Sequence, residues 1–405
     1  MIRYPNVLEP IFTALQSHAI KPIIVGGFIR NTLLGINSKD IDIELYNLSS
    51  LKELENILNQ FGKINFVGAS FGVAKLRYQD FELDFSLPRK ENKIEAGHRG
   101  FSITIDSSLD FKTAASRRDF TINTIGYDIS EKKLLDPFGG IDDLKQKILK
   151  AVNPKSFIED PLRVLRAARF CAVYELKIDK ELFCLCSQMV EQHLLDELAK
   201  ERVFEEIKKI VLNSKKPSIG LDILRELKTD IYITNTTITD ALVKENIANK
   251  QTKLVLMLAA LCYDKNTKGC EVFLRKLTDE KELLESALKL VELWSEVENT
   301  DSDYKLYKLA AKVNIDKLLL LYKAIYPQKN IIYETVYKRA KELSILDKKL
   351  PPLLIGKDLI NLGLSPSTQF KTILDDAYEA QMHSIFKDKE DAILWLKNYL
   401  ISKFS

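Results

Sequence analysis

Apolar and polar positions divide the chain into a first part with strand signals and a longer helical part. From Asp40 to Leu45 the alternation is strict, so three acidic side chains point to one face and three apolar side chains to the other. Further strands are predicted at residues 23–25, 73–78 and 81–87, and a short helix at 28–34. The first 145 residues therefore predict a mixed α and β region.

Helical periodicity dominates after about residue 145. Helices are predicted at residues 162–170, 180–195, 200–212, 221–227, 250–262, 279–297, 305–313 and 331–343. Pro351 and Pro352 interrupt this pattern before a last helical segment, which predicts a boundary. The segment from Pro88 to Ser116 is long, polar and basic in its first half, which indicates a functional loop with one strand at 101–105.

Length and composition narrow the class of protein. A chain of 405 residues is too long for one hydrophobic core, so we expect two to four domains. The 60 basic and 57 acidic residues give a net charge of only +3, and any patch that binds nucleic acid must therefore be local. The five cysteines form no regular framework and are expected to be reduced thiols. Because the sequence has neither a signal peptide nor an apolar run of about 20 residues, we expect a cytoplasmic protein without membrane spans.

Asp40 and Asp42 are the first residues that suggest chemistry. Two positions apart on a strand, their carboxylates lie on one face and repel each other unless a cation lies between them. Mg²⁺ prefers such oxygen ligands. An exposed acidic strand face gives the same pattern, and this simpler interpretation is favoured if the Asp-x-Asp sequence is taken alone.

A glycine pair upstream changes that balance. Gly26 and Gly27 stand at a predicted strand-to-helix turn, where glycine allows the backbone to approach a phosphate and the helix offers free N–H groups. Arg30 follows and can add a charge-assisted bond. A lone glycine pair usually marks only a tight turn, but the order Gly-Gly, Arg, Gly35 and Asp-x-Asp is a specific combination.

The segment Val25–Gly35 followed by Asp40-Ile41-Asp42 resembles the head of class II tRNA nucleotidyltransferases and bacterial poly(A) polymerases. Further motifs of that superfamily follow in the same order, and they are Arg117–Asn123 (RRDFTIN), Asp136–Gly140 (DPFGG), Glu159–Phe170 (EDPLRVLRAARF) and, more weakly, Glu201–Glu205. Residues 354–364 look like the tail of CCA-adding enzymes, whereas residues 207–350 match only in being helical. One departure is Asn31, where the superfamily commonly has Asp.

The resemblance implies an α+β fold. A polymerase-β-like nucleotidyltransferase head, with a mixed sheet and helices, is expected to precede an all-α neck, body and tail. The implied boundaries are 1–145 for the head, or palm, 146–215 for a neck that recognises the nucleotide base, 216–350 for a body and 351–405 for a tail, the last two binding tRNA.

The resemblance also implies the site. Asp40 and Asp42 would be the catalytic residues and would bind Mg²⁺, so that two metal ions assist the in-line attack of a 3′-hydroxyl on an α-phosphate. The residues implied to bind the nucleotide are Gly27, Arg30, Arg118, Asp119, Asp160, Arg163, Arg166 and Arg169. Arg118 and Asp119 are expected to meet the sugar and phosphates. Asp84 is a possible third carboxylate, but a solvated strand face explains it at least as well.

The segment Glu159–Phe170 carries the prediction of base choice. Pro161 suits the first helical position, which makes Asp160 a helix cap, and this structural role is favoured without the resemblance. Arg163 is one turn away, and the arginines at 163, 166 and 169 stay within one half of the helix surface. The Asp160 carboxylate as acceptor beside the Arg163 guanidinium as donor matches the base edges of cytosine and adenine, whereas uracil and guanine would leave the carboxylate unpaired.

Together these observations predict a CCA-adding tRNA nucleotidyltransferase. It would add C, C and A to the tRNA 3′ end from CTP and ATP without a nucleic-acid template. The alternatives are a poly(A) polymerase, a partial enzyme that adds only CC or only A, and a catalytically inactive tRNA-binding protein, although the intact Asp40 and Asp42 argue against the last. The expected partners are the acceptor and TΨC arms of tRNA, with no membrane and no stable protein partner. None of the four histidines is followed by Asp, so we expect no His-Asp phosphohydrolase domain.

Overall fold

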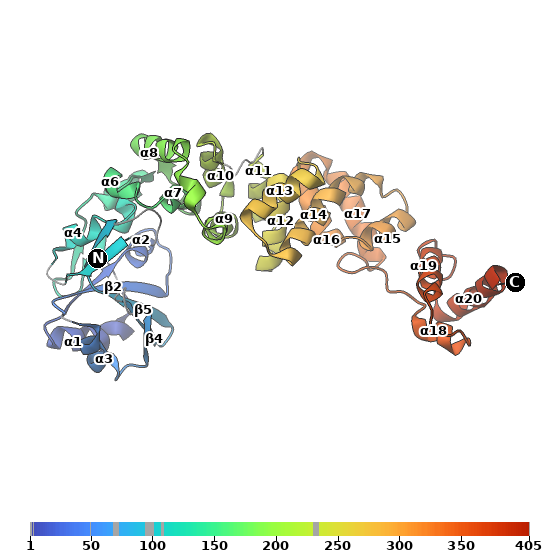
Figure 1. Cartoon of the computed structure of the whole chain (residues 1–405), viewed down its shortest axis with the longest axis horizontal. Coiled ribbons are helices and arrows are strands. Elements are labelled where there is room, and N and C mark those ends of the chain that lie inside the picture. The colour runs from blue at the N-terminus through green and yellow to red at the C-terminus, as the bar shows by residue number, and fades with distance from the viewer. Residues whose placement is uncertain are drawn as a thin grey trace. The chain divides into compact units, whose positions relative to one another are not determined.

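The computed structural model describes residues 2, 4–48, 50–67, 73–93, 101–106, 109–229 and 235–404. Contacts divide the chain into two units, residues 1–232 and 233–405. Strands are drawn in the first unit, and the second contains helices α11 to α20 (Figure 1). This confirms the predicted fold class, an α+β region followed by a helical remainder. The finer division into head, neck, body and tail stays a proposal.

A mixed sheet of seven strands forms the centre of the first unit, in the order β3-β4-β5-β2-β1-β8-β9. The strands are β1 (Lys21–Val25), β2 (Asp40–Tyr46), β3 (Ile64–Val67), β4 (Val73–Tyr78), β5 (Phe81–Ser86), β8 (Gly126–Asp128) and β9 (Lys133–Leu135). Only β2 and β5 run parallel; the other neighbouring pairs are antiparallel. The structure confirms the strands predicted from alternation, and it adds β3, β8 and β9, which are short.

The predicted loop from Pro88 to Ser116 contains more regular structure than expected. A separate hairpin pairs β6 (Arg89–Lys93) with β7 (Phe101–Ile105), which confirms the strand predicted at 101–105. The helix α4 (Phe111–Ala115) follows, and the Asp110 carboxylate caps it by accepting the N–H of Thr113 at 2.8 Å. The loop positions 94–100 and 107–108 lie outside the described residues.

Helices pack around this sheet and extend the first unit. They are α1 (Glu9–Ser17), α2 (Gly27–Leu33), α3 (Leu51–Leu58), α5 (Gly140–Gln146), α6 (Pro154–Phe157), α7 (Leu162–Tyr174), α8 (Lys180–Glu191), α9 (Lys200–Asn213) and α10 (Pro217–Glu226), with short 3-10 turns at Asn6–Leu8 (η1), Thr121–Asn123 (η2) and Leu194–Glu197 (η3). The expectation that strands end at residue 145 was wrong in one detail. Two-residue strands β10 (Ile148–Leu149) and β11 (Lys177–Ile178) pair in parallel, and such short strands give no alternation signal.

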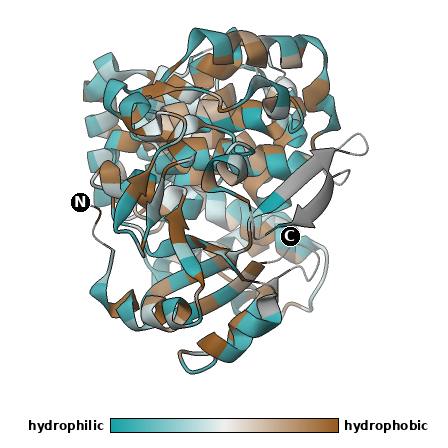
Figure 2. Ribbon diagram, turned by 90° about the vertical axis from the view of Figure 1, so that its left-hand side faces the viewer, coloured by the Kyte–Doolittle hydropathy of each residue, from teal (hydrophilic) through white to brown (hydrophobic). Residues whose placement is uncertain are grey.

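The buried apolar face of β2 explains how its acidic face is fixed in position. Ile41, Ile43 and Leu45 of β2, which alternate with the acidic residues, are buried, with exposed fractions of 0–1%. Figure 2 shows apolar and polar positions interleaved along the helices and strands, as expected for elements that bury one face. The buried face fixes the register of β2, so its acidic face is set in place as well.

The second unit is helical. Its elements are α11 (Thr237–Lys244), α12 (Lys250–Cys262), α13 (Thr267–Leu277), α14 (Lys281–Leu293), η4 (Trp294–Asn299), α15 (Asp303–Ala310), α16 (Ile315–Ile325), η5 (Pro327–Lys329), α17 (Asn330–Glu342), α18 (Gly356–Asn361), α19 (Gln369–Met382) and α20 (Lys389–Phe404). The prediction missed α11, α13 and α16. Side chains of Asn266 and Asn314 cap the last two by accepting backbone N–H groups.

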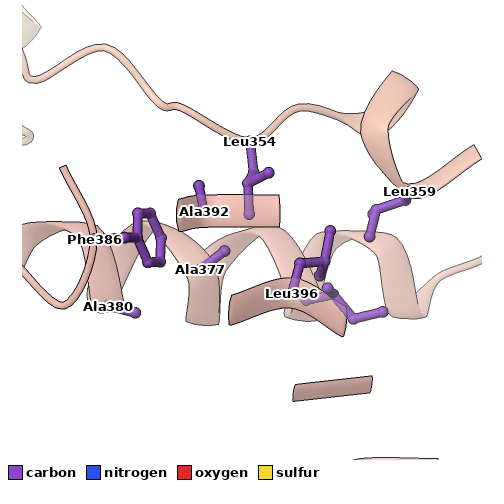
Figure 3. Close-up of a cluster of buried hydrophobic side chains, with 8 residues drawn as sticks. Leu354, Leu359, Ala377, Ala380, Phe386, Ala392 and Leu396 are labelled. Carbon is purple, nitrogen blue, oxygen red and sulfur yellow. The ribbon is translucent and has the colours of Figure 1, made fainter. Parts of the chain in front are cut away.

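The last three helices have an apolar core of their own. Leu354, Phe386 and Leu396 point toward one another around the small side chains Ala377 and Ala392 (Figure 3). This core follows Pro351, where the sequence predicted a boundary.

Two cysteines depart from the expectation of reduced thiols. Cys262, at the end of α12, and Cys270, in α13, form a disulfide with their Cα atoms 5.4 Å apart. The turn between the two helices brings these Cα atoms within the range that a disulfide spans. A sequence separation of eight residues does not by itself predict this pairing. Cys171, Cys184 and Cys186 are free. No helix in the described ranges combines the length and apolar content needed to cross a bilayer.

Candidate functional site

A cavity of about 380 Å³ lies in the first unit, where the acidic side of the sheet meets α7 and α9. The lining residues are Gly26, Gly27, Arg30, Asp42, Arg117, Arg118, Asp119, Asn123, Asp160, Leu162, Arg163, Arg166, Phe170 and Arg202. Six of them are arginines and three are aspartates, so positive charge is in excess. A concave surface of this kind concentrates anions such as phosphate groups.

The glycine pair joins β1 to α2 at the cavity wall. Gly26 has a φ of +67°, which favours glycine. A Cβ atom at Gly26 would lie 2.9 Å from Nη1 of Arg118 and 3.7 Å from Oδ2 of Asp42. Glycine at this position therefore leaves room for a guanidinium beside a carboxylate, a role that the sequence did not suggest.

The acidic residues of β2 occupy different environments. Both aspartates are exposed, but Asp42 lines the cavity, whereas Asp40 is not one of the described lining residues. Asp42 is opposite Asp84 of β5 in the parallel register, and Asp84 forms an ion pair with Lys75 at 2.6 Å. Although solvent reaches Asp42, surrounding protein raises the pKa of its carboxyl; Arg118 opposes this rise, and Asp84 and Asp40 add to it.

The carboxylates of Asp40 and Asp42 are compatible with the binding of a divalent cation. Within the described ranges, no set of three or more Asp, Glu, His or Cys side chains is arranged to hold a metal ion. Mg²⁺, however, commonly uses one or two protein carboxylates together with substrate phosphates and water. Asp40 and Asp42 fit such a site, because a cation would offset both the burial and the smaller repulsion from Asp84 and Asp40 that raise the pKa of Asp42.

Glu44 is the third acidic residue on this face of β2, and the sequence analysis gave it no role. Its side chain is only 1% exposed, and it accepts hydrogen bonds from Arg118 Nη2 at 2.8 Å and from Tyr46 Oη at 3.0 Å. Arg117 Nη2 lies 3.5 Å from the same carboxylate. Burial favours a higher pKa for Glu44, but Arg118 and Arg117 outweigh it and hold the pKa below its usual range.

Asp119 lines the cavity, but its oxygens are already bonded within the protein. Oδ1 accepts the N–H of Phe120 at 2.9 Å and the amide of Asn123 at 2.8 Å. Oδ2 accepts Nε of Arg166 at 2.8 Å and also pairs with Nη2 of that residue. Burial raises the pKa of Asp119, yet Arg166 and Asn123 more than compensate and lower it overall. The expected contact of Asp119 with the sugar gives way to a proposed role in orienting Arg166.

Arg30 is held in a similar way. It is buried, pairs through Nη1 with the Asn123 amide oxygen, and donates through Nη2 to the Tyr174 hydroxyl at 2.5 Å. Asn31 accepts both Nη2 at 3.0 Å and Nε at 3.3 Å. Since these direct partners are neutral, burial lowers the pKa of Arg30. The substitution of Asn for the usual Asp keeps the hydrogen bonds but removes a counter-charge from this arginine.

The start of α7 brings Asp160 and Arg163 to the cavity. Asp160 Oδ1 accepts the N–H of Leu162 at 3.1 Å, so the predicted capping role is present together with the position in the cavity. Oδ1 also lies 3.8 Å from Arg202 of α9. Arg163 donates from Nη1 to the Ser156 carbonyl at 2.8 Å and from Nη2 to the Arg117 carbonyl at 3.0 Å. Two backbone carbonyls thus fix its guanidinium next to Asp160.

The three arginines of α7 do not all face the cavity. Arg163 and Arg166 line it, but Arg169 is not one of the described lining residues. Nε of Arg169 instead lies 2.9 Å from Oε2 of the buried Glu206 carboxylate in α9, with which it forms an ion pair. The expected stripe of three was therefore too long, because 100° of rotation per residue turns the third arginine toward the neighbouring helix.

The Asp136–Gly140 motif supports the site from outside the cavity. The Asp136 carboxylate accepts the N–H groups of Gly140 at 2.7 Å and Ile141 at 2.9 Å at the start of α5. A Cβ atom at Gly140 would lie 2.2 Å from the carbonyl oxygen of Thr121. This close packing holds η2, whose Asn123 contacts both Arg30 and Asp119.

The sequence analysis missed Glu44, Arg117, Asn123 and Arg202 as members of this cluster. Each had a signal: Glu44 continues the alternation of the two aspartates, Arg117 and Asn123 belong to the RRDFTIN segment, and Arg202 to the weaker neck motif. What the sequence lacked was the pairing, since Glu44 and Arg118 are 74 positions apart.

Comparisons with known proteins agree with this geometry. Residues 23–150 match the family described as poly A polymerase head domain, and residues 175–229 the family described as probable RNA and SrmB-binding site of polymerase A. The multifunctional CCA protein of Neisseria gonorrhoeae is 37% identical over 203 residues, 50% of this chain and 47% of that protein. That of Xanthomonas campestris is 36% identical over 212 residues, 51% and 49%. The matches thus span about half the length of these relatives.

Solved structures resemble the whole chain in fold. The CCA-adding enzyme of Bacillus stearothermophilus in complex with CTP has a TM-score of 0.74 and 20% identity over 99% of both chains. The CCA-adding enzyme of Thermotoga maritima complexed with tRNA has a TM-score of 0.72 and 20% identity, covering 98% of this chain and 97% of that one. At this identity the likeness shows the fold, and it extends over both units.

Proposed function

Because the chain belongs to the superfamily of class II tRNA nucleotidyltransferases and bacterial poly(A) polymerases, we propose that it adds C, C and A to the 3′ end of tRNA, using CTP and ATP. The observation that carries this proposal is the cationic cavity, in which the Asp42 carboxylate and the Asp160–Arg163 pair are all present. The proposal includes Mg²⁺ as the metal and the cytoplasm as the compartment.

The reaction would be a nucleotidyl transfer. The 3′-hydroxyl of the RNA loses its proton to solvent and its oxygen forms a bond to the α-phosphorus of the triphosphate. The bond from this phosphorus to the bridging oxygen of the β-phosphate breaks, and pyrophosphate leaves. Mg²⁺ held by Asp40 and Asp42 would neutralise charge on the reacting oxygens. The protein itself supplies the positive wall of the cavity.

Arg118 is the arginine best placed to meet the phosphates. Its Nη1 donates to the Asn123 carbonyl at 3.1 Å and its Nη2 to Glu44, so one N–H of each remains. Its buried Nε has no acceptor among the described residues. Arg166, oriented by Asp119, adds a second fixed cation. Guanidinium groups fixed in this way stabilise charge that develops on phosphate oxygens without first having to reorganise.

Base choice would rest on Asp160 and Arg163. The cap bond and Arg202 approach Oδ1 of Asp160, while Oδ2 has no protein donor among the described residues. A carboxylate oxygen of this kind accepts the amino group of cytosine or adenine, and the remaining N–H groups of Arg163 donate to the ring acceptors. Uracil and guanine present a carbonyl oxygen to the carboxylate, which costs about 1–3 kcal/mol for an unpaired buried acceptor.

The helical second unit is proposed to bind the acceptor and TΨC arms of tRNA, mainly through backbone shape. The proposed functions are assigned to the four parts predicted from the sequence, a head at 1–145, a neck at 146–215, a body at 216–350 and a tail at 351–405. The likeness of both units to an enzyme solved with tRNA supports it.

The test uses tRNA transcripts that end before CCA, after C and after CC, each incubated with one nucleoside triphosphate at a time. We expect CTP to extend the first two transcripts and ATP to extend only the third, with product length read on a denaturing gel. Long tails from ATP on every transcript would instead assign a poly(A) polymerase. Extension that stops after CC, or that begins only from CC, would assign a partial enzyme. Binding of tRNA without any extension would overturn the proposal in favour of an inactive binding protein.

A further inference from the structure

We propose that Glu44 is a positioning residue, which fixes the guanidinium of Arg118 against the cavity wall and keeps it from pairing with Asp42. This inference rests on the proposed function, since its purpose is to present Arg118 to a triphosphate. Glu44 itself is not a cavity-lining residue in the described ranges, and it acts through the arginine.

The position of Glu44 on β2 is the first argument. Asp40, Asp42 and Glu44 share one face of the strand, and along this face the residues pass from solvent through the cavity wall to full burial. A buried carboxylate loses several kcal/mol of hydration free energy. Only partners that bond it well compensate for a cost of this size. At the same buried place, an apolar side chain would avoid this cost.

The bonds made by Arg118 are the second argument. Glu44 accepts from its Nη2 at 2.8 Å, the Asn123 carbonyl accepts from its Nη1 at 3.1 Å, and Gly26 leaves the space that Nη1 occupies. These contacts hold the guanidinium in one orientation. The geometry therefore fixes the direction of the donors that remain for a ligand.

A competing partner is the third argument. Arg118 and Asp42 are oppositely charged and both approach Gly26, where a Cβ atom would lie 2.9 Å from Nη1 of Arg118 and 3.7 Å from Oδ2 of Asp42. If the charge of Glu44 were removed, the guanidinium would turn toward the Asp42 carboxylate, the anion that it meets at Gly26. It would then leave its place on the phosphate wall and occupy the carboxylate proposed to bind metal.

The same protein offers a matched control. Glu206 of α9 is also a buried glutamate, 3% exposed, and it pairs with Arg169 at 2.9 Å and Lys209 at 3.3 Å. Neither Glu206 nor its two partners line the cavity within the described residues. Glu206→Gln thus removes a charge from a comparable buried pair that makes no contact with Arg118 among the described residues, although Glu206 acts electrostatically on Arg166 of the cavity wall.

The experiment compares Glu44→Gln, Glu206→Gln, Arg118→Ala and the double variant Glu44→Gln/Arg118→Ala in the full-length protein. The dissociation constant for CTP is measured in EDTA, and kcat and KM for CTP are measured with a tRNA that ends after the first C. Thermal midpoints show that each variant is folded. Glu44→Gln is expected to weaken CTP binding and raise KM by about tenfold, the scale of a charge-assisted hydrogen bond.

The double variant separates positioning from a general effect on the fold. If Glu44 acts only through Arg118, Glu44→Gln adds no further loss of CTP affinity in the Arg118→Ala background. Losses that multiply, or an unchanged CTP affinity in Glu44→Gln, would overturn the inference. So would an equal loss in Glu206→Gln. A wild-type protein that extends no tRNA would instead count against the proposed function, while the binding measurements would still decide the role of Glu44.

Discussion

The two units of this chain differ in whether they bury charged side chains. Every buried charged residue in the described ranges belongs to the first unit, and they are Arg30, Glu44, Asp119, Asp128, Asp143 and Glu206. The buried polar residues of the second unit are all uncharged, and its ion pairs, such as Lys305 with Asp301, are at least partly exposed to solvent. Both units are nevertheless built around apolar cores of ordinary kind.

The difference shows where burial of charge is tolerated. An ion pair in the interior is often no more stabilising than apolar residues of the same size, so stability alone does not explain why the first unit contains several. Glu44 and Asp119 each orient an arginine of the cavity wall. The helical unit, in contrast, uses its charges on the surface, where they contribute little to folding. The comparison predicts that equal substitutions have unequal effects in the two units.

The largest effect is expected from the two aspartates of β2. Asp40→Ala and Asp42→Ala should each abolish incorporation of both CTP and ATP, a loss of about a thousandfold or more, because each removes a proposed ligand of Mg²⁺. The measurement is the rate of single-nucleotide addition at saturating Mg²⁺. Asp142→Ala, which removes an exposed carboxylate paired with Lys145 in the same unit, is the control and should retain its activity. Appreciable activity in Asp40→Ala would contradict the assignment of the exposed aspartate.

The next effect concerns stability. Asp119→Ala leaves Arg166 without its buried counter-charge and should cost about 3–5 kcal/mol in the free energy of unfolding, measured with urea. A loss below about 1 kcal/mol would mean that Arg166 finds another partner or water, and the contrast between the two units would be weaker than the structure indicates.

Acid should act on the same carboxylate. Because the pKa of Asp119 is lower in the folded protein than in the unfolded chain, its contribution is present in full above the unfolded pKa and is lost as pH falls through the folded pKa. Asp119→Asn removes this titration. The variant should therefore lose less stability than the wild type when urea denaturation is repeated between about pH 5 and pH 3. Parallel curves for the two proteins over this window would contradict the lowered pKa.

The sequence was sufficient wherever a local rule applied. Alternation located β4 at residues 73–78, and the same rule placed Asp40 and Asp42 on one face of β2. It failed where the outcome depended on distant partners. A period of three along α7 could not reveal that Arg169 turns to Glu206, and no local pattern links Glu44 to Arg118. The motifs identified most of the cavity residues, but the pairs that hold them became apparent only from the fold.

Base choice gives a smaller expected effect. Asp160→Ala should reduce discrimination of CTP over UTP by about 10- to 100-fold, equivalent to about 1–3 kcal/mol, while tRNA affinity changes little. The measurement is kcat/KM for each nucleotide on a transcript that ends before CCA. Asp110→Ala is the matched control, because it removes a carboxylate cap from α4 outside the cavity and should leave base choice intact. If Asp160→Ala left the preference for CTP over UTP unchanged, capping of α7 would be the role that remains for Asp160.

The smallest effect is expected in the second unit. Arg339 of α17 donates to Asp303 of α15 through Nε at 2.7 Å and Nη2 at 2.5 Å, the same two nitrogens that Arg166 uses toward Asp119, although both of those reach the one oxygen Oδ2. Both side chains are more than a third exposed, so water solvates either partner when the other is removed. Asp303→Ala should therefore cost no more than about 1 kcal/mol in urea denaturation. A loss as large as that of Asp119→Ala would show that contact geometry, and not burial, sets the energy of these pairs, and the distinction between the two units would no longer hold.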